Sequence, residues 1–302
     1  MKRLALVLCV LVCAAQAQKG KFTTYTTTWN GLTRQYSVYV PPVLQVHPAM
    51  VMALHGTAIV QENDPPLTAC TKNMAWDALA DSNGFLLICP VATWKAIGTA
   101  GQFFWESFGT DNYFPVTPDD SGYLRSLIVA MEKPTTSGGY AVDPKRVFVM
   151  GFSTGAFMSH RACVEISDLV AACSPVSGVL WVQDSSIVIP PPSQPVSIFE
   201  LRGDEDTTIW YCGGLFWAFG EGHVPVPGVD VDVNYWLGAD GLGPNTTPLC
   251  SNTNPAPNAF GVDFKSADGK TEVQFAREIG YDHTFKVTTI STVWEFFSNH
   301  GR

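Results

Sequence analysis

Apolar positions along the chain follow two periods, one typical of strands and one typical of helices. Strands are predicted at 36–40, 50–54, 85–89, 147–150 and 196–201, and a strand-like run covers 272–279. Helices are predicted at 73–82 and 156–164, from Asp120 or Ser121 through Met131, and around 293–297. Because strands and helices alternate, the pattern predicts an α/β fold with a mostly parallel central sheet flanked by helices on both faces.

The first residues differ from the rest of the chain. A short basic start at Lys2 and Arg3 precedes an apolar run over 4–14, and Ala15 and Ala17 then offer small side chains. This pattern predicts a signal peptide over 1–17, cleaved after Ala17. The run is too short to span a bilayer, which takes about 20 apolar residues. We therefore expect a secreted, extracellular protein with a single catalytic domain over 18–302.

Cysteine usage agrees with an extracellular protein. Apart from Cys9 and Cys13, which lie in the predicted signal peptide, six remain: Cys70, Cys89, Cys163, Cys173, Cys212 and Cys250. An even number in a secreted chain predicts up to three disulfides. We favour Cys212 with Cys250, because this pair would close the stretch 212–260, which is rich in Gly, Pro and Asn and is expected to be a long functional loop. No Cys-x-x-Cys pair is present, which disfavours a zinc site.

The charge balance excludes some partners. The chain has a net charge of -9, and loss of Lys2 and Arg3 (two positive charges) takes it to -11. An acidic protein repels phosphate backbones and anionic lipids, so neither nucleic acid nor a membrane surface is expected as a partner. Asn245-Thr246-Thr247 is a sequon for N-glycosylation.

The chemistry begins at Ser153. The segment from Gly151 to Gly155 fits the pattern Gly-x-Ser-x-Gly, with an apolar strand before it and a helical segment after it. A strand that turns at once into a helix strains the serine backbone and requires small neighbours, and it exposes the hydroxyl at the sheet edge. Ser153 is therefore the candidate nucleophile, and the amide of Thr154 at the helix start could hold an oxyanion.

A nucleophilic serine needs a histidine base and an acid, in the chain order Ser, Asp or Glu, His in this type of fold. Of four later histidines, His160 lies two turns into the helix, and His300 is expected to fray near the C-terminus. His223 lies in the irregular stretch, whereas His283 follows the strand-like run 272–279. We therefore predict His283 as the base.

The acid and the second oxyanion donor follow from the same logic. Asp204, Glu205 and Asp206 all come directly after the strand that ends at Leu201, and the pattern alone leaves the three open. The loop after the early strand reads His55-Gly56-Thr57, so the amide of Thr57 is the predicted donor.

Aromatic residues gather in loop-like segments near these positions. Such clusters form core as often as pockets, and we take Trp105, Trp210 and Tyr211 as candidates for binding an aromatic acyl group or a sugar.

Several motifs together resemble the secreted feruloyl esterases, acetylxylan esterases and single-domain polyhydroxybutyrate depolymerases of the α/β-hydrolase fold, from about Arg34 to Phe297. The motifs are Leu54-His55-Gly56, Trp76 with Ala80-Asp81 and Gly84-Phe85, Asp119-Asp120 with Gly122-Tyr123-Leu124, Val142-Asp143-Pro144-Lys145-Arg146-Val147, the turn at Gly151, and Ser174-Pro175-Val176-Ser177-Gly178.

The resemblance also chooses among the acids. The family's acid motif is similar to His-Gly-x-x-Asp followed by an apolar residue, Pro and Tyr, which points to Asp206. Arg202 stands in place of the usual His and Trp210 in place of the usual Pro, so the pocket beside the acid is expected to differ from the family's.

The resemblance implies a three-layer α/β hydrolase with a Ser153–His283–Asp206 triad, an oxyanion hole from Thr57 and Thr154, and neither metal nor organic cofactor. It implies a monomer acting on a polysaccharide-linked or polymeric ester, with feruloyl esters of plant cell walls as the main expectation. Acetylxylan esterase and polyester depolymerase are the alternatives within esterases. A noncatalytic carbohydrate-binding protein on this scaffold is a distant alternative, and a peptidase is favoured by nothing in the sequence.

Overall fold

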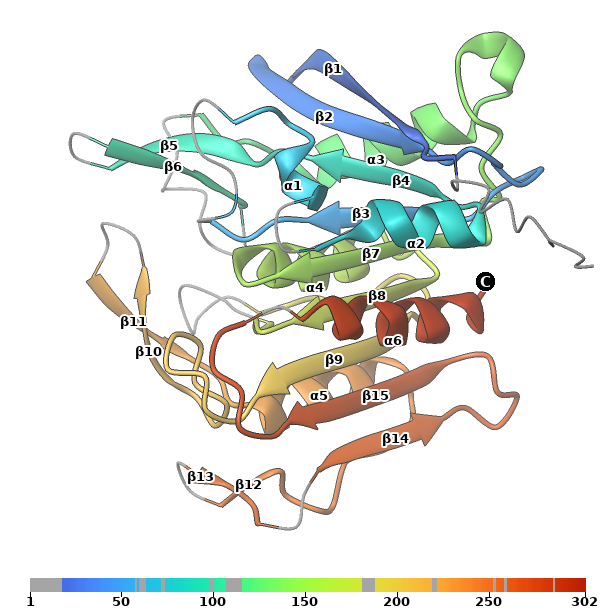
Figure 1. The fold of residues 1–302 in the computed structure, drawn as a ribbon. Coiled ribbons are helices and arrows are strands. Elements are labelled where there is room, and N and C mark those ends of the chain that lie inside the picture. The colour runs from blue at the N-terminus through green and yellow to red at the C-terminus, as the bar shows by residue number, and fades with distance from the viewer. Residues whose placement is uncertain are drawn as a thin grey trace, which may run out of the picture.

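A nine-stranded sheet runs through the molecule in the order β1-β2-β4-β3-β7-β8-β9-β15-β14 (Figure 1). This computed structural model describes residues 18–57, 59, 64–71, 74–97, 100–106, 116–180, 188–218, 222–251, 254–257, 260–284 and 286–302. The predicted signal peptide over 1–17 lies outside the described residues.

Six central strands run parallel, and the strands at both edges are antiparallel to their neighbours. The parallel strands are β3 (Met50–Leu54), β4 (Leu86–Pro90), β7 (Val147–Phe152), β8 (Ala172–Val176), β9 (Ser197–Gly203) and β15 (Glu272–Glu278). The edges are β1 (Lys21–Trp29) with β2 (Leu32–Val40) on one side and β14 (Gly261–Lys265) on the other. β3, β4 and β7 are apolar along nearly their whole length because both of their faces are covered.

Helices cover the two faces of the sheet in separate sets (Figure 1). One set is α1 (Thr68–Thr71), α2 (Trp76–Asn83) and α6 (Val287–Ser298), and the other is α3 (Asp120–Glu132), α4 (Thr154–Glu165) and α5 (Val229–Ala239). Along β3, Met52 and Leu54 pack into the core that contains α3, α4 and α5, whereas Val51 and Ala53 pack into the core on the opposite face. The predicted three-layer fold is confirmed.

The stretch 212–260 was predicted to be a long loop, and this prediction was wrong. It contains α5, a hairpin of β10 (Gly214–Ala218) and β11 (Gly222–Val226), and the short pair β12 (Cys250–Ser251) and β13 (Asn254–Pro255). In α5, Val229, Val233 and Trp236 share one face and are buried in the core. The Gly, Pro and Asn content of the flanking turns concealed this helical spacing.

The start of α3 also differs from the prediction. Asp119, and not Asp120 or Ser121, caps the helix, and its Oδ1 accepts a hydrogen bond from the Gly122 amide. Asp120 is buried instead and forms an ion pair with Arg34 at 2.6 Å. A second hairpin, β5 (Thr93–Ile97) with β6 (Ala100–Phe104), follows β4, and a short 3-10 turn covers Thr135–Ser137.

All six cysteines outside the predicted signal peptide form disulfides. Cys212 pairs with Cys250, as predicted, and the other pairs are Cys70 with Cys89 and Cys163 with Cys173. Cys212 precedes the β10–β11 hairpin and Cys250 begins β12, so their bond joins the two ends of the segment that contains α5. Within the described ranges, none of the helices combines the length and hydrophobicity needed to cross a membrane.

Candidate active site

Ser153 lies in a tight turn between β7 and α4. Its backbone has φ 57° and ψ -122°, a conformation that a residue with a side chain adopts only at some cost. Glycines make this turn possible. A Cβ at Gly151 would overlap the carbonyl of Gly155, and one at Gly155 would overlap the carbonyl of Leu54. The spacing Gly-x-Ser-x-Gly therefore reflects direct crowding between strand and helix.

Three side chains from distant parts of the chain meet at this turn. The Nε2 of His283 lies 2.9 Å from the Oγ of Ser153, and its Nδ1 lies 2.8 Å from the Oδ2 of Asp206. Because a carboxylate can only accept a hydrogen bond, Nδ1 carries the ring proton and donates a hydrogen bond to Asp206. Nε2 then accepts a hydrogen bond from the hydroxyl of Ser153. The orientation is the one that lets the ring take a proton from Ser153.

Asp206 is held in place from its own loop. It is buried, and its Oδ1 accepts hydrogen bonds from the amides of Thr208 and Ile209, both at 2.8 Å. The other oxygen is thereby directed at His283. Among the three acidic residues that the sequence left open, Asp206 is the one that contacts the imidazole in the described part of the chain.

Asp204 has a different contact set. Its carboxylate accepts from the Nε of Arg277 at 2.8 Å and from the amide of Gly280 at 2.6 Å. Asp282 makes the reciprocal contact, since its Oδ1 accepts from the amide of Thr207 at 3.1 Å. These bonds hold the loop after β9 against the loop after β15, and thereby hold Asp206 beside His283.

The loop after β3 lies directly against Ser153. A Cβ at Gly56 would stand 3.0 Å from the Cβ of Ser153. The hydroxyls of Thr57 and Thr154 hydrogen-bond to each other at 2.7 Å. Thr57 and Thr154, the two residues predicted to form the oxyanion hole, are therefore neighbours at the turn that carries Ser153. That their amides donate hydrogen bonds to an oxyanion remains a prediction.

His55 supports this loop, a role that its position in the His55-Gly56-Thr57 motif does not reveal. The ring is buried, its Nε2 accepts from the amide of Ala92 at 3.1 Å, and its Nδ1 donates to the carbonyl of Gly56 at 2.9 Å. Burial lowers the pKa of His55 to about 4, so the ring stays neutral and keeps this tautomer.

Two of the three aromatic residues predicted to bind substrate have no accessible surface for it. Trp105 is fully buried and donates its indole N–H to the carbonyl of His55 at 2.9 Å. Tyr211 is 2% exposed and packs against Phe275. For both, the expectation is not met, because each ring fills a space inside the fold. Trp210 is 47% exposed and its indole covers Gly214, and its contact with substrate remains a prediction.

The histidines not chosen as base have other surroundings. His160 is buried in α4, and His223 is exposed on β11. His300 was expected to fray, which is wrong: the ring is buried, with Nδ1 2.7 Å from the carbonyl of Phe296 and Nε2 3.1 Å from Glu272.

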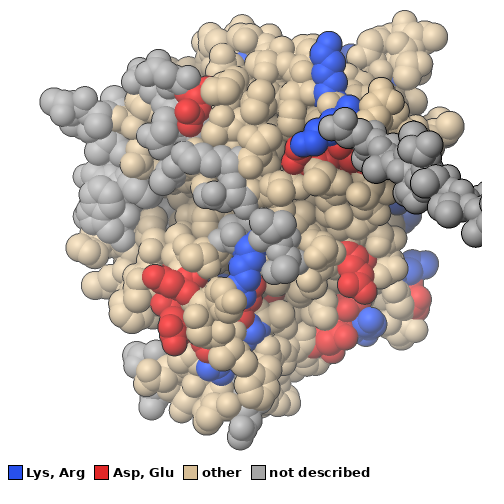
Figure 2. All heavy atoms as spheres, in the orientation of Figure 1, with Lys and Arg blue, Asp and Glu red and all other residues tan. Residues whose placement is uncertain are grey.

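The surface agrees with the low charge content of the sequence. On the described part of the face in Figure 2, uncharged residues cover most of the area, and basic side chains do not gather into an extended patch.

Comparisons with known proteins place this geometry in context. No protein-family profile matches the chain. A bifunctional acetylxylan esterase/xylanase of Neocallimastix patriciarum is 26% identical over 272 residues, which is 89% of this chain and 34% of that protein. Feruloyl esterase B of Piromyces equi is 35% identical over 97 residues, 32% of this chain and 17% of that protein. The chain thus spans about a third or less of the length of these relatives.

Solved structures share the fold over nearly the whole chain. An acetyl xylan esterase from Aspergillus awamori has a TM-score of 0.60 at 18% identity, covering 92% of this chain and 99% of that one. The protein has the α/β-hydrolase fold. A feruloyl esterase module from Clostridium thermocellum matches with a TM-score of 0.51 at 15% identity, covering 93% of this chain and 88% of that one.

The resemblance drawn from sequence motifs is confirmed by these relatives. They include a poly(3-hydroxyalkanoate) depolymerase of Paucimonas lemoignei, 24% identical over 140 residues, which is 46% of this chain and 30% of that protein. Acetylxylan esterases, feruloyl esterases and polyester depolymerases are therefore all represented among the relatives of this chain.

Proposed function

We propose that this protein is a secreted serine carboxyl-ester hydrolase with Ser153 as nucleophile, His283 as base and Asp206 as acid. The observation that carries the proposal is the continuous pair of hydrogen bonds, 2.8 Å from Asp206 to His283 and 2.9 Å from His283 to Ser153. The relatives, named as esterases and a depolymerase, support the same reaction class.

The reaction follows from the contacts at the site. Ser153 Oγ bonds to the ester carbonyl carbon while its proton passes to the Nε2 of His283. The carbonyl oxygen becomes an oxyanion, which the amides of Thr57 and Thr154 stabilise. His283 then gives the proton to the leaving alcohol oxygen as the bond from carbon to that oxygen breaks. Water repeats the sequence on the acyl-enzyme and releases the acid, and Asp206 stabilises the imidazolium throughout without taking the proton.

Feruloyl esters of plant cell walls are the main proposed substrate, because feruloyl and acetylxylan esterases recur among the relatives and structural neighbours. The exposed ring of Trp210, in the loop that also carries Asp206, offers an apolar surface for an aromatic acyl group or a sugar. Acetylated xylan and polyhydroxybutyrate are the alternatives. We propose one catalytic domain over 18–302, acting as a monomer without a cofactor.

Secretion is part of the proposal. The signal-peptide pattern over 1–17 supports it, and so do three disulfides, because such bonds persist in oxidising compartments. Glycosylation at Asn245, whose neighbours Thr246 and Thr247 are exposed, belongs to the same proposal.

A noncatalytic carbohydrate-binding protein on this scaffold is the other class to consider. Binding alone does not need a serine, a histidine and a buried aspartate joined by two short hydrogen bonds. The triad geometry therefore favours the enzyme.

Labelling by a fluorophosphonate and turnover of p-nitrophenyl acetate test the proposal in wild type, Ser153→Ala and His283→Ala. We expect labelling and turnover in wild type alone, and full turnover in Ser153→Ala would refute the role of Ser153. Product analysis on methyl ferulate, acetylated xylan and polyhydroxybutyrate then identifies the substrate class. Release of acetate or hydroxybutyrate without ferulate would replace the feruloyl assignment.

A further inference from the structure

Four ionisable side chains form a buried cluster beneath the candidate active site. Glu200 and Arg202 lie on β9, Asp232 on α5 and His160 on α4, and each is at most 1% exposed. The Nε of Arg202 lies 2.6 Å from Glu200, and its Nη2 donates to Asp232. Burial costs each ion roughly several kcal/mol of hydration free energy. Buried charged side chains therefore persist where they pair with one another.

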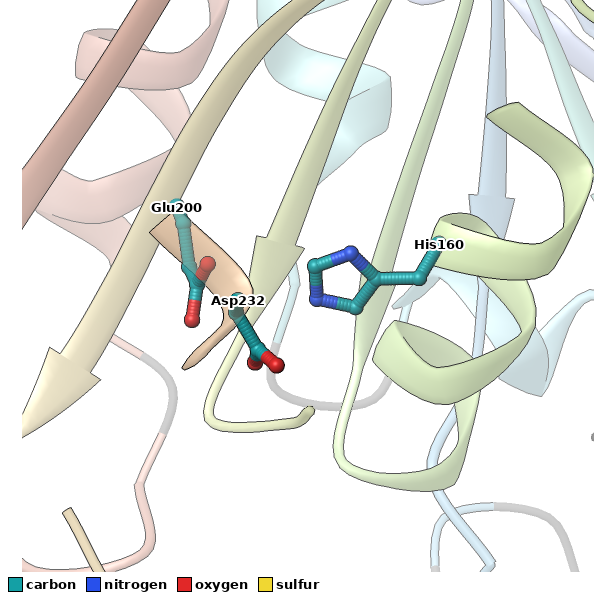
Figure 3. Close-up of side chains that lie close together, drawn as sticks. All are labelled: His160, Glu200 and Asp232. Carbon is teal, nitrogen blue, oxygen red and sulfur yellow. The ribbon is translucent and has the colours of Figure 1, made fainter. Parts of the chain in front are cut away.

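Three members of the cluster have the spacing of a metal site. A ring nitrogen of His160 and carboxylate oxygens of Glu200 and Asp232 all lie within 4.8 Å of one another. Figure 3 shows the ring projecting from α4 toward both carboxylates.

The tautomer of His160 argues against a metal. The indole N–H of Trp236 donates to the Nδ1 of His160 at 3.0 Å, and an indole nitrogen cannot accept. Burial, and to a lesser degree Arg202, lowers the pKa of His160, so the ring is neutral and its single proton must be on Nε2. The nitrogen that faces the carboxylates therefore carries a proton and has no free lone pair for a metal ion, and it lies near the carboxylates without a hydrogen bond to them in the described part of the chain.

The cluster connects the parts of the fold that carry the triad. His160 lies on α4, which starts at Thr154, directly after Ser153. Arg202 is at the end of β9, and the chain continues from there through Gly203 to Asp206.

Asp232 adds a third connection. Its Oδ2 accepts from the amide of Leu180 at 3.1 Å. In the same loop, a Cβ at Gly178 would stand 2.8 Å from the carbonyl oxygen of Ser153. The loop that Asp232 holds therefore lies against the backbone of Ser153.

We propose that His160, Asp232, Arg202 and Glu200 act together as positioning residues, which fix the nucleophile helix relative to the acid strand and thereby set the geometry of Ser153, His283 and Asp206. The proposal rests on the proposed esterase function. The cluster touches no reacting atom, so its effect reaches the chemistry through α4 and β9.

The charge of the cluster makes this role dependent on pH. Two carboxylates face one guanidinium, and the other titratable groups beside Glu200 and Arg202 in the described part of the chain are the neutral imidazole of His160 and the buried phenol of Tyr211. Burial raises the pKa of Glu200 to about 8, with Arg202 opposing and Asp232 adding to the rise. At neutral pH Glu200 thus holds a proton and the cluster is balanced. Above about pH 8 Glu200 ionises, and its uncompensated negative charge repels Asp232 and so loosens the link between β9 and α5.

Two amide substitutions with opposite expected outcomes test the proposal. Glu200→Gln resembles the protonated state, so kcat at pH 7 should stay within about twofold of wild type and its decline above pH 8 should diminish. Asp232→Asn removes the anion that pairs with Arg202, so kcat should fall about tenfold or more with KM little changed. Asp263→Asn, exposed on β14, is the matched control and should leave both constants unchanged.

A readout besides activity separates this proposal from the esterase proposal. The low-field proton NMR signal of His283 Nδ1–H reports its bond to Asp206 even in a protein without turnover. It should shift or broaden in Asp232→Asn and stay unchanged in Glu200→Gln at pH 7. Urea unfolding establishes that each variant is folded.

Two outcomes would overturn the proposal. A folded Asp232→Asn with wild-type kcat and an unchanged His283 signal would remove the positioning role. Stoichiometric Zn²⁺ binding in equilibrium dialysis, lost in His160→Gln, would overturn the tautomer assignment and make the cluster a metal site.

Discussion

The backbone of Gly56 lies so close to Ser153 that a methyl group on Gly56 would stand 3.0 Å from the serine Cβ and 3.2 Å from the carbonyl of Phe152. On its other side, the loop is held by the bond from His55 Nδ1 to the Gly56 carbonyl. The position of the Thr57 amide is therefore determined by contacts on both sides of Gly56.

Gly56→Ala should reduce catalysis more than stability. The added methyl has to displace the loop by a few tenths of an ångström, which misaligns the proposed oxyanion donor at Thr57. Loss of one such donor costs about 10²- to 10³-fold in kcat, so partial misalignment should cost about 10- to 100-fold. Turnover of p-nitrophenyl acetate measures the effect. Gly238→Ala is the control, since nothing lies within 4 Å of a Cβ there; equal kcat in the two variants would contradict the assignment.

Asp206→Asn and Asp204→Asn should have different effects, although the residues are two positions apart. An amide at 206 can donate to His283 and so favour the wrong tautomer, and the equivalent change in a serine-protease triad lowers kcat by about 10⁴-fold. At 204 the amide weakens the bonds to Arg277 and Gly280 but leaves Asp206 and His283 in contact.

The measurement for this pair is kcat together with the urea midpoint. We expect Asp204→Asn to lose stability and to keep most of its turnover. If Asp204→Asn were the inactive variant and Asp206→Asn the active one, the acid would have to be reassigned.

The predictable parts of the site were those set by local constraints. The turn at Ser153 needs glycines on both sides, and a buried strand leads into it, so sequence alone identifies it. The proposed base follows from chain order, because His283 lies in the loop after β15. The choice of Asp206 over Asp204 needed the family resemblance, since both follow the same strand and only long-range contacts distinguish them.

What the sequence could not predict was burial within irregular segments. Trp105 and Tyr211 lie in irregular segments, as pocket residues do, yet each fills a space created by distant parts of the chain. The helix α5 was missed for a related reason. Its flanks are rich in turn residues, and its apolar face is recognised only once the helix packs in the core.

His55 should make stability depend on pH. Its pKa is lowered to about 4 in the folded protein, against about 6.5 in an unfolded chain. The unfolded state therefore binds more protons in this range, so the stabilisation is fully present above about pH 6.5 and is lost as pH falls toward 4, by about 3 kcal/mol at most. Urea unfolding at several pH values measures it. His55→Gln should show a shallower pH dependence than wild type, and identical curves would exclude the contribution.

His300→Ala should destabilise the protein without impairing catalysis. The ring joins the end of α6 to β15 through the carbonyl of Phe296 and the carboxylate of Glu272, which also receives Lys265 at 3.2 Å. Removing it deletes two hydrogen bonds and leaves a buried carboxylate with fewer partners, so the free energy of unfolding should fall by about 2 kcal/mol. Urea unfolding with the disulfides intact measures the loss.

His223→Ala, exposed on β11, is the control and should stay within about 0.5 kcal/mol of wild type. Equal stability of His300→Ala and His223→Ala would mean that the C-terminus frays, as the sequence first indicated, and that the bond to Glu272 contributes nothing in solution.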